Sequence, residues 1–379
     1  MLPSNWQKVR LGDIAEIIGG GTPSTQVTSF WNGSINWFTP TEIGITKYVY
    51  KSQRTITPLG LKKSSAKLLP IGTILLTSRA SIGDCAILKV VATTNQGFQS
   101  LIPLEKINNE FLYYLMLTLK NKLLELASGS TFLEVSPNKI KNLLIPLPPL
   151  NEQIAIANVL SDVDRYLYSL DALILKKESV KKALSFELLS QRKRLKGFNQ
   201  AWQKVRIGDI AEIKRGVRIT KNELDVFGKY PVVSGGVGFL GYTNNFNRYE
   251  NTITIAQYGT AGYVNFQKNK FWANDVCFCV YPNKDVIKNI FLYYFLKVNQ
   301  NYLYEISNRN ATPYSISKDK ILDFEILLPP LNEQIAIANI LSGLDNEIIS
   351  LKNKKRQFDN IKKALNHDLM SAKIRVLNK

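Results

Sequence analysis

The sequence is poor in the residues that build metal and nucleophilic centres, with one histidine and three cysteines among 379 residues. The histidine, His367, lies among charged residues, so neither a histidine-based triad nor a metal cluster can be assembled around it. The cysteines, Cys85, Cys277 and Cys279, are odd in number and lack C-x-x-C spacing, which excludes a disulfide framework. Because Cys277 and Cys279 alternate with Phe278 in a strand-like run, we expect them to be buried.

Long hydrophobic runs are also missing. The longest largely nonpolar stretch, residues 111–119, falls well short of the roughly 18 residues that a membrane span needs. The first ten residues contain no signal-peptide core. We therefore expect a cytoplasmic protein.

Acidic residues are scarce relative to basic ones, 30 against 49, which gives a formal net charge of +19. Residues 1–150 hold 15 basic and 8 acidic residues, and residues 196–331 hold 17 and 11. Each half of the chain thus carries its own basic excess, and nucleic acid is the natural partner of such a distribution. A basic surface that serves only solubility is the alternative.

Internal repetition dominates the sequence. WQKVRLGDIAEI at residues 6–17 returns as WQKVRIGDIAEI at 202–213, and LPPLNEQIAIANVLSDVD at 147–164 returns as LPPLNEQIAIANILSGLD at 328–345. The first pair is displaced by 196 positions and the second by 181, so the first copy holds about fifteen more residues between these landmarks. The chain is a tandem duplication whose scaffold repeats while its loop-rich stretches diverge. One frame that presents two reading surfaces would give this pattern, and so would neutral loop drift.

Each repeat begins with a mixed region. Short β-like runs, such as residues 73–77 and 251–256, alternate with turns rich in Gly, Asn, Ser and Thr. One helical stretch starts near Phe111 in the first repeat and near Phe291 in the second. These features predict an α+β domain with an irregular sheet in each repeat.

Each repeat ends in a long predicted helix. The double prolines at 148–149 and 329–330 end the preceding strand, because proline lacks an amide donor and restrains the residue before it. Asn151 and Asn332 then stand where an N-cap belongs. The expected helices of about 45 residues would each extend about 65 to 70 Å, longer than a single domain needs.

Apolar residues in both helices follow the 4-3 spacing of a coiled-coil seam. If a pseudo-twofold axis relates the repeats, the two seams pair antiparallel and the helices become a spacer between the domains. The alternative is that each helix packs only against its own domain. The predicted seam residues are Ile156, Leu160, Val163, Leu167, Leu170, Ile174, Leu184, Leu188, Ile337, Leu341, Leu344, Ile348, Leu351, Phe358, Leu365 and Leu369.

Motifs for chemistry are absent from the sequence. No G-x-x-x-x-G-K-[ST] loop and no Asp/Asn-Pro-Pro-aromatic motif of an amino-methyltransferase occurs. Residues 212–214 form the one E-x-K half-motif of some metal-dependent nucleases, and the equivalent residues 16–18 of the first repeat read EII. We expect no catalytic residue, metal site or cofactor in this chain.

Polar, basic and aromatic loop residues therefore remain as the predicted functional surface. Arg and Lys can pair with guanine edges or phosphate, and Asn and Gln with adenine. The candidates in the first repeat are Thr22, Ser24, Thr25, Lys47, Ser78, Arg79, Asn95, Gln96 and Thr131. The candidates in the second repeat are Arg215, Arg218, Lys221, Tyr258, Thr260, Asn274, Arg309, Asn310 and Thr312.

The twin LPPLNEQIAIAN motifs, each opening a heptad helix and each preceded by a W-x-x-x-x-L/I-G-D-I domain, resemble the specificity subunits of type I restriction-modification systems. The resemblance spans essentially the whole chain. It implies two target-recognition domains, at residues 1–146 and 197–327, and two spacer helices, at 147–196 and 328–379. The recognition loops cannot be carried over, because these domains differ within the family in what they read.

The resemblance also implies partners. Such subunits read a bipartite, asymmetric site on double-stranded DNA, with the paired helices fixing the unread gap. Two modification subunits, which bind S-adenosylmethionine and methylate adenine, dock on the helical scaffold, where residues 151–157 and 332–338 belong. Restriction subunits that use ATP and Mg²⁺ then join. The alternatives are a stand-alone DNA nuclease or methyltransferase, and a coiled-coil interaction protein that does not bind DNA.

Overall fold

The computed structural model describes residues 3–129 and 133–376. Contacts divide the chain into two compact units, and each combines one globular domain with parts of both long helices. Unit 1 comprises Met1–Asp171 with Lys354–Lys379, and unit 2 comprises Ala172–Asn353.

The domain of unit 1 is built on a five-stranded sheet with strand order β2-β9-β6-β7-β4. The strands are β2 (Ala15–Gly19), β9 (Gln99–Pro103), β6 (Ile74–Leu76), β7 (Cys85–Leu88) and β4 (Tyr48–Val49). All neighbours pair antiparallel except β4, which runs parallel to β7. A second sheet, β5-β3-β8, and a ribbon of β1 with β10 complete the β structure. Their bounds are β5 (Arg54–Ile56), β3 (Trp31–Phe38), β8 (Ala92–Thr94), β1 (Gln7–Arg10) and β10 (Leu144–Leu147).

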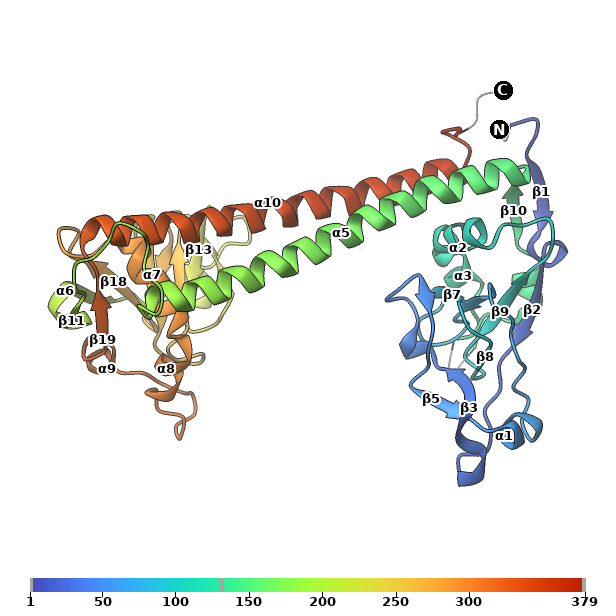
Figure 1. Ribbon diagram of the computed structural model, residues 1–379, viewed down its shortest axis with the longest axis horizontal. Coiled ribbons are helices and arrows are strands. Elements are labelled where there is room, and N and C mark those ends of the chain that lie inside the picture. Colours follow the sequence, from blue (N-terminus) through green and yellow to red (C-terminus); the bar gives the residue numbers. More distant parts are fainter. Residues whose placement is uncertain (1–2, 130–132, 377–379) are drawn as a thin grey trace. The chain divides into compact units, whose positions relative to one another are not determined.

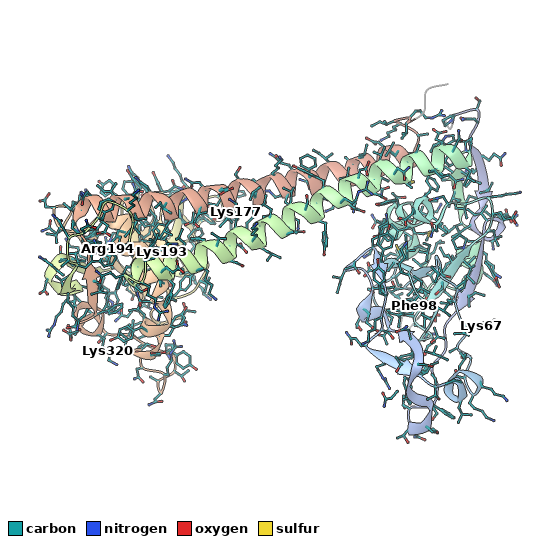
Figure 2. The ribbon with its side chains drawn as sticks, in the orientation of Figure 1. Lys67, Phe98, Lys177, Lys193, Arg194 and Lys320 are labelled. Carbon is teal, nitrogen blue, oxygen red and sulfur yellow. The ribbon has the colours of Figure 1, made fainter. Side chains whose placement is uncertain are left out.

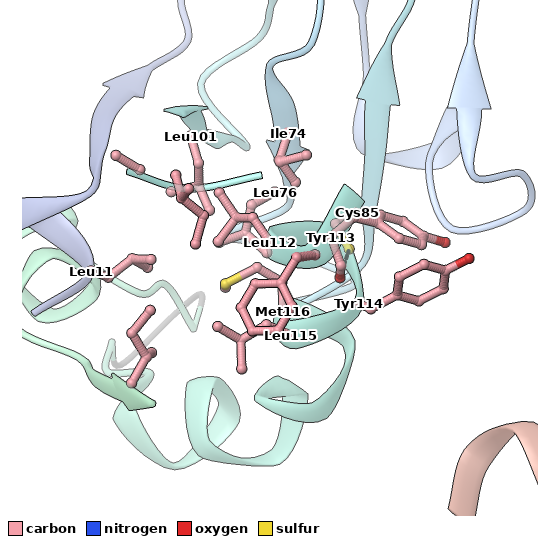
Figure 3. Close-up of a cluster of buried hydrophobic side chains, with 14 of the residues drawn as sticks. Leu11, Ile74, Leu76, Cys85, Leu101, Leu112, Tyr113, Tyr114, Leu115 and Met116 are labelled. Atoms are coloured by element: carbon pink, nitrogen blue, oxygen red, sulfur yellow. Dashed lines mark hydrogen bonds between the residues drawn. The ribbon is translucent and has the colours of Figure 1, made fainter. Parts of the chain in front are cut away.

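Helix α2 covers the main sheet of unit 1 and buries most of its residues in the core (Figure 3). Its N-cap is Asn108, whose side chain accepts a hydrogen bond from the backbone N–H of Phe111 at 2.9 Å. Tyr114 and Met116 from α2 pack with Ile74, Leu76 and other strand residues. The helices of the domain are α1 (Pro58–Lys62), α2 (Asn109–Thr118), α3 (Lys120–Leu126) and α4 (Pro137–Lys141).

Unit 2 repeats this topology with one strand fewer. Its main sheet has the order β12-β18-β15-β16 and its second sheet the order β14-β13-β17. The bounds are β11 (Gln203–Arg206), β12 (Ala211–Arg215), β13 (Tyr230–Val233), β14 (Phe239–Thr243), β15 (Thr252–Ala256), β16 (Val264–Gln267), β17 (Trp272–Ala273), β18 (Cys277–Pro282) and β19 (Glu325–Leu328). The helices are α6 (Ile207–Ile210), α7 (Asn289–Val298), α8 (Gln300–Glu305) and α9 (Lys318–Leu322). Short 3-10 turns lie at Leu11–Asp13, Thr28–Phe30, Pro40–Glu42 and Lys221–Glu223. The predicted α+β class is confirmed for both domains.

The two long helices, α5 (Leu150–Leu189) and α10 (Leu331–Met370), are unbroken (Figure 1) and contain 40 residues each, somewhat fewer than predicted. The predicted N-caps were wrong by two positions, because both helices start at the leucine that follows the double proline. Asn332 lies inside the first turn, where its side-chain oxygen accepts the N–H of Glu333 at 2.9 Å.

The predicted seam residues all lie on the inner faces of the helices. Ten are buried, namely Ile156, Leu160, Leu167, Leu170, Ile174, Leu188, Ile337, Leu341, Ile348 and Leu369. The other six, Val163, Leu184, Leu344, Leu351, Phe358 and Leu365, are partly buried. Within each unit the seam also joins the core of the domain, as Ile156 and Leu369 do in unit 1. Packing against the partner helix and against the domain therefore occur together.

Ion pairs give the direction of the helix pairing. In unit 1, Asp164 of α5 pairs with Lys362 of α10, and Asp171 pairs with Lys355 at 2.9 Å. In unit 2, Asp345 of α10 pairs with Lys181 of α5. Residue numbers fall on one helix as they rise on the other, so the helices are antiparallel in each unit. The carboxylates near the start of each helix face lysines near the end of the other.

A buried glutamate in the first turn of each helix joins three elements. The Glu333 side chain is 0% exposed and accepts hydrogen bonds from the Trp202 indole at 3.0 Å and the Arg194 guanidinium at 2.6 Å. Arg194 lies just past the end of α5 (Figure 2). Glu152 receives the same pair of donors, from Trp6 at 3.1 Å and from Arg375, which lies just past the end of α10. We call these two sets the Arg–Glu–Trp clasps.

The glutamine after each glutamate fixes the domain to the helix. Gln334 donates to the carbonyls of Pro329 at 2.8 Å and Val286 at 3.0 Å, and it accepts the N–H of Lys288 at 2.7 Å. Gln153 makes the equivalent contacts in unit 1. The repeated glutamate and glutamine of the N-E-Q letters are therefore explained by buried contacts. Across the described residues, no helix has the length and apolar character to span a membrane.

We predict that Arg194→Met lowers the free energy of unfolding by about 3 to 5 kcal/mol, because it leaves the buried Glu333 carboxylate without its cation. The matched control is Lys204→Met, which removes the same charge from an exposed pair with Glu325 and should cost about 0 to 1 kcal/mol. Urea unfolding followed by tryptophan fluorescence measures both losses. Equal losses in the two variants would contradict the role of the clasp.

Candidate nucleic-acid interface

The loops that carry the predicted recognition residues gather at one end of the main sheet in unit 1. Gly19, at the end of β2, lies opposite Gln99 at the start of β9, and Thr77, after β6, bridges to Phe98. The other end of the sheet, where Ala15 lies opposite Pro103, leads toward the long helices, since the carbonyl of Lys106 shortly after β9 accepts a hydrogen bond from Gln153 of α5 at 3.1 Å. The loop end and the helix end of the sheet are thus opposite.

Backbone hydrogen bonds hold these loops against one another. Ser78 donates its N–H to the carbonyl of Gly97 at 2.8 Å, and its own carbonyl accepts the N–H of Val135 at 3.0 Å. Gly21 donates to Thr94 at 2.8 Å. Four segments, around Gly21, Ser78, residues 94–97 and Val135, therefore form one surface, which we call loop cluster 1.

Unit 2 assembles its loops in the same way. Thr260 donates its N–H to Gly235 at 2.9 Å, and Gly259 donates to Tyr314 at 3.0 Å. Asn274 donates to Val233 at 2.9 Å. We call this surface loop cluster 2.

One glycine is required at the same place in both clusters, because the backbones approach too closely for a side chain. A Cβ on Gly20 would lie 1.8 Å from the carbonyl oxygen of Asn95, and one on Gly216 would lie 2.0 Å from that of Asn274. These glycines are 196 positions apart, as are the two WQKVR motifs. The shared framework thus extends to the root of each loop cluster.

The side chains of loop cluster 1 are mainly neutral. Ser24, Thr25 and Gln96 are exposed, while Thr22 and Asn95 are partly buried. Arg79 is paired with Glu134 at 2.9 Å. Thr131 lies outside the described residues.

The side chains of two candidates in unit 1 are buried inside the protein. The side chain of Lys47 is 11% exposed and ion-paired with Glu110, and it donates to Tyr114 Oη at 2.9 Å and Ser161 Oγ at 2.8 Å. Burial lowers the pKa of this lysine, with Glu110 opposing the shift. Lys47 therefore attaches the domain to α5. Ser78 is 1% exposed and supplies backbone bonds to the loops.

Loop cluster 2 carries more positive charge. Arg215, Arg218 and Lys221 are exposed along one loop, and Arg309, Asn310 and Thr312 are exposed along another, while Tyr258 and Thr260 are partly buried. The Arg309 guanidinium lies over the rings of Tyr304 and Tyr314, 5.0 and 4.8 Å from their centroids, which restricts its orientation. Tyr314 is itself 44% exposed and was missed, although it lies in the same loop as Thr312.

The side chain of the candidate Asn274 makes hydrogen bonds inside the protein. Its Oδ1 accepts the N–H groups of Ile219 at 3.2 Å and Asp275 at 2.9 Å, and its Nδ2 donates to Ser234 Oγ at 3.2 Å. The residue is 8% exposed. It positions the loop that carries Arg218.

The structure also places the residues considered for chemistry. Glu212 and Lys214 of the E-x-K half-motif pair with each other at 3.0 Å on an exposed strand. His367 is exposed on α10, and all three cysteines are buried and free. Within residues 3–129 and 133–376, no group of three or more His, Cys, Asp or Glu side chains is arranged to hold a metal ion.

Comparison with known proteins identifies the family. The family model described as type I restriction modification DNA specificity domain matches residues 3–177 and 199–358. The chain belongs to this family. The two matches correspond to the two repeats, and the resemblance inferred from the twin motifs is confirmed.

Relatives and solved structures agree with this family. The MjaIX type I restriction enzyme specificity subunit of Methanocaldococcus jannaschii is 34% identical over 243 residues, which cover 59% of this chain and 55% of that protein. The chain thus spans about half the length of that relative. The putative MjaX specificity subunit of the same organism is 27% identical over 416 aligned positions, covering 99% and 95%. The crystal structure of a type I S subunit from M. genitalium has the same fold, with a TM-score of 0.66, 20% identity and 98% of each chain covered.

Proposed function

We propose that this chain is the specificity subunit of a type I restriction-modification complex, and that its two loop clusters read the two halves of a bipartite DNA site. The observation that supports this most is the combination of one repeated scaffold with two chemically different loop clusters at the same end of the domain sheets. A repeated frame with different contact residues is what reading two different sequences requires.

The chemistry of the clusters favours an asymmetric site. Cluster 2 presents Arg215, Arg218, Lys221 and Arg309 to solvent, and arginine pairs well with the O6 and N7 atoms of guanine. Cluster 1 presents hydroxyl and amide groups, with its Arg79 neutralised by Glu134. We infer that the half-sites differ in sequence, and that cluster 2 contributes more of the salt-dependent affinity for phosphates.

We infer that two modification subunits dock on the repeated helix starts. Ile154 and Ile335 are 42% and 44% exposed at equivalent positions, and Asn151 and Asn332 are exposed beside them. Packing inside this chain does not explain why these exposed residues are identical in both copies. A surface presented twice suits two copies of one partner.

The chemistry of modification and restriction would then belong to partner subunits. S-adenosylmethionine would bind to the modification subunits, and ATP and Mg²⁺ to restriction subunits where these are present. This chain would supply recognition and assembly without a catalytic residue or cofactor of its own. It would act in the cytoplasm, where its DNA lies.

We predict that Arg218→Ala and Arg309→Ala each weaken specific DNA binding by about 1 to 3 kcal/mol if the arginines contact bases. If they contact phosphate, each variant instead lowers the slope of log K against the logarithm of the salt concentration by about 1. Fluorescence anisotropy with the assembled methylase, on a duplex carrying its methylated motif, measures both quantities. Lys284→Ala is the matched control, because Lys284 is exposed just after β18, at the helix end of the same domain. A loss in Lys284→Ala as large as in the arginine variants would count against cluster 2 as the reading surface.

We predict that Ile335→Glu reduces the number of bound modification subunits from two to one, and that Ile154→Glu combined with Ile335→Glu removes both. The buried carboxylate would oppose an apolar contact. Light scattering on the purified complex gives the stoichiometry. Ile361→Glu, at a site 50% exposed but outside the repeated motif, should retain two subunits, and two subunits in all variants would refute the docking surface.

A further inference from the structure

The two main sheets differ at one edge. In unit 1, β4 adds to the outer edge of β7, whereas in unit 2 no described strand pairs with the outer edge of β16. The difference arises in one connection, since residues 39–53 join β3 to β5 while residues 234–238 join β13 to β14. The short hairpin of unit 2 contains no equivalent of β4.

In unit 1 the added strand closes the edge and contacts the helices. Ile87 donates its N–H to the carbonyl of Lys47 at 2.8 Å, and Lys89 donates to Val49 at 3.0 Å. The Lys47 ammonium then reaches Tyr114 of α2 and Ser161 of α5. One extended segment thus covers the sheet edge and also fills the adjoining space between the domain and the long helices.

In unit 2 the equivalent space between the domain and the long helices is open. A groove of about 630 Å³ lies among α5, α7 and α10. Tyr294, the counterpart of Tyr114, lines it together with Ile348, Ile349, Phe186 and Lys297. Ile349 and Phe186 are 46% and 45% exposed, so the groove offers apolar surface to an incoming side chain.

The groove also holds a cation without a carboxylate partner. Lys181 pairs with Asp345, and Lys352 pairs with Glu178, but among the described residues no carboxylate pairs with Lys297. Its ammonium donates to the carbonyl of Val264 on β16 at 2.7 Å. Burial, and then the charge of Lys181, lower the pKa of Lys297, which an added anion would reverse.

The two repeats differ around this groove, and the differences invert the placement of the lysine and the carboxylate seen in unit 1. Lys297 stands where unit 1 has Leu117, and Ile290 stands where unit 1 has Glu110. In unit 1 the scaffold supplies the carboxylate and the added strand supplies the lysine. In unit 2 the scaffold supplies the lysine, so a complementary strand would have to carry the carboxylate.

We propose that the groove and the outer edge of β16 bind an extended acidic segment of a partner protein. A carboxylate of that segment pairs with Lys297, an apolar side chain covers Ile349, and its backbone adds to β16 beside Phe266 as β4 adds to β7. The N–H of Phe266 bonds to the side chain of Asn265 at 2.8 Å. When the strand is added, this N–H donates instead to a backbone carbonyl of that strand. This site is present once per chain, unlike the twofold surface of the helix starts.

The test uses two labelled peptides based on the segment that fills this place in unit 1. One is the natural residues 44–50, GITKYVY, and the other is GITEYVY, in which the lysine is replaced by glutamate. Fluorescence anisotropy with the full chain should show GITEYVY binding about tenfold more tightly, as expected for one charge-assisted pair. Equal binding of both peptides, or no binding of GITEYVY up to millimolar concentration, would overturn the proposal.

Variants of the chain locate the site. Lys297→Met should abolish the preference for GITEYVY, and Lys297→Glu should reverse it, whereas the exposed control Lys284→Met should leave it unchanged. Thermal unfolding checks that each variant is folded. If a DNA duplex displaces the peptide and Lys297→Met weakens DNA binding to the same degree, the groove is a phosphate site and the proposal fails.

Discussion

The antiparallel pairing of α5 with α10 is the constraint on which the rest of the structure depends. Each helix starts with carboxylates and ends with lysines, so antiparallel pairing brings Asp164 to Lys362 in unit 1 and Asp345 to Lys181 in unit 2. The opposite direction would place like charges together. At each end, an arginine just past one helix reaches the buried glutamate that begins the other. Unit 1 is therefore assembled from two distant parts of the chain, and in both units the start of one long helix is completed by an arginine from the other repeat.

The attachment of each domain to the helices and the exposed loop cluster lie at opposite ends of the domain. The residues that must stay constant are therefore separate from the residues that can vary. The tryptophan, glutamate and glutamine of each repeat make buried contacts, so a change in any of them would disturb the attachment of domain to helix. The loop clusters lie at the opposite end of each sheet, and their exposed side chains make few internal contacts. Arg218 or Thr25 can therefore change at little cost to the frame, which is what a protein family with diverse recognition requires.

Much of the architecture could be predicted from the sequence because it is encoded twice. The duplication and the heptad spacing predict two α+β domains and two paired helices without knowledge of any contact. The roles of Glu333 and Gln334 could not be predicted, because their partners, Trp202 and Val286, are 131 and 48 residues away. The helix starts lie two residues earlier than predicted, because a proline can occupy the N-cap position that was assigned to the asparagine.

The functional residues were harder to predict, for a physical reason. Lys47, Ser78 and Asn274 have the residue types of a DNA contact, but whether a polar side chain faces solvent depends on partners that only the fold brings near. For Lys47 that partner is Ser161, 114 residues away. Arg215, Arg218 and Arg309 remain exposed, so for them the expectation from residue type still stands.

We propose that the paired helices set the spacing of the two half-sites, and one measurement tests this directly. Seven residues are inserted between Asp171 and Ala172 and also between Asn353 and Lys354, two positions that the Asp171–Lys355 pair places opposite each other. The insertion adds about 10 Å to each helix, or about three base pairs of DNA. Single-molecule sequencing of methylated adenines should then show both half-sites unchanged and the gap between them longer by about that amount, whereas an unchanged gap would contradict the account.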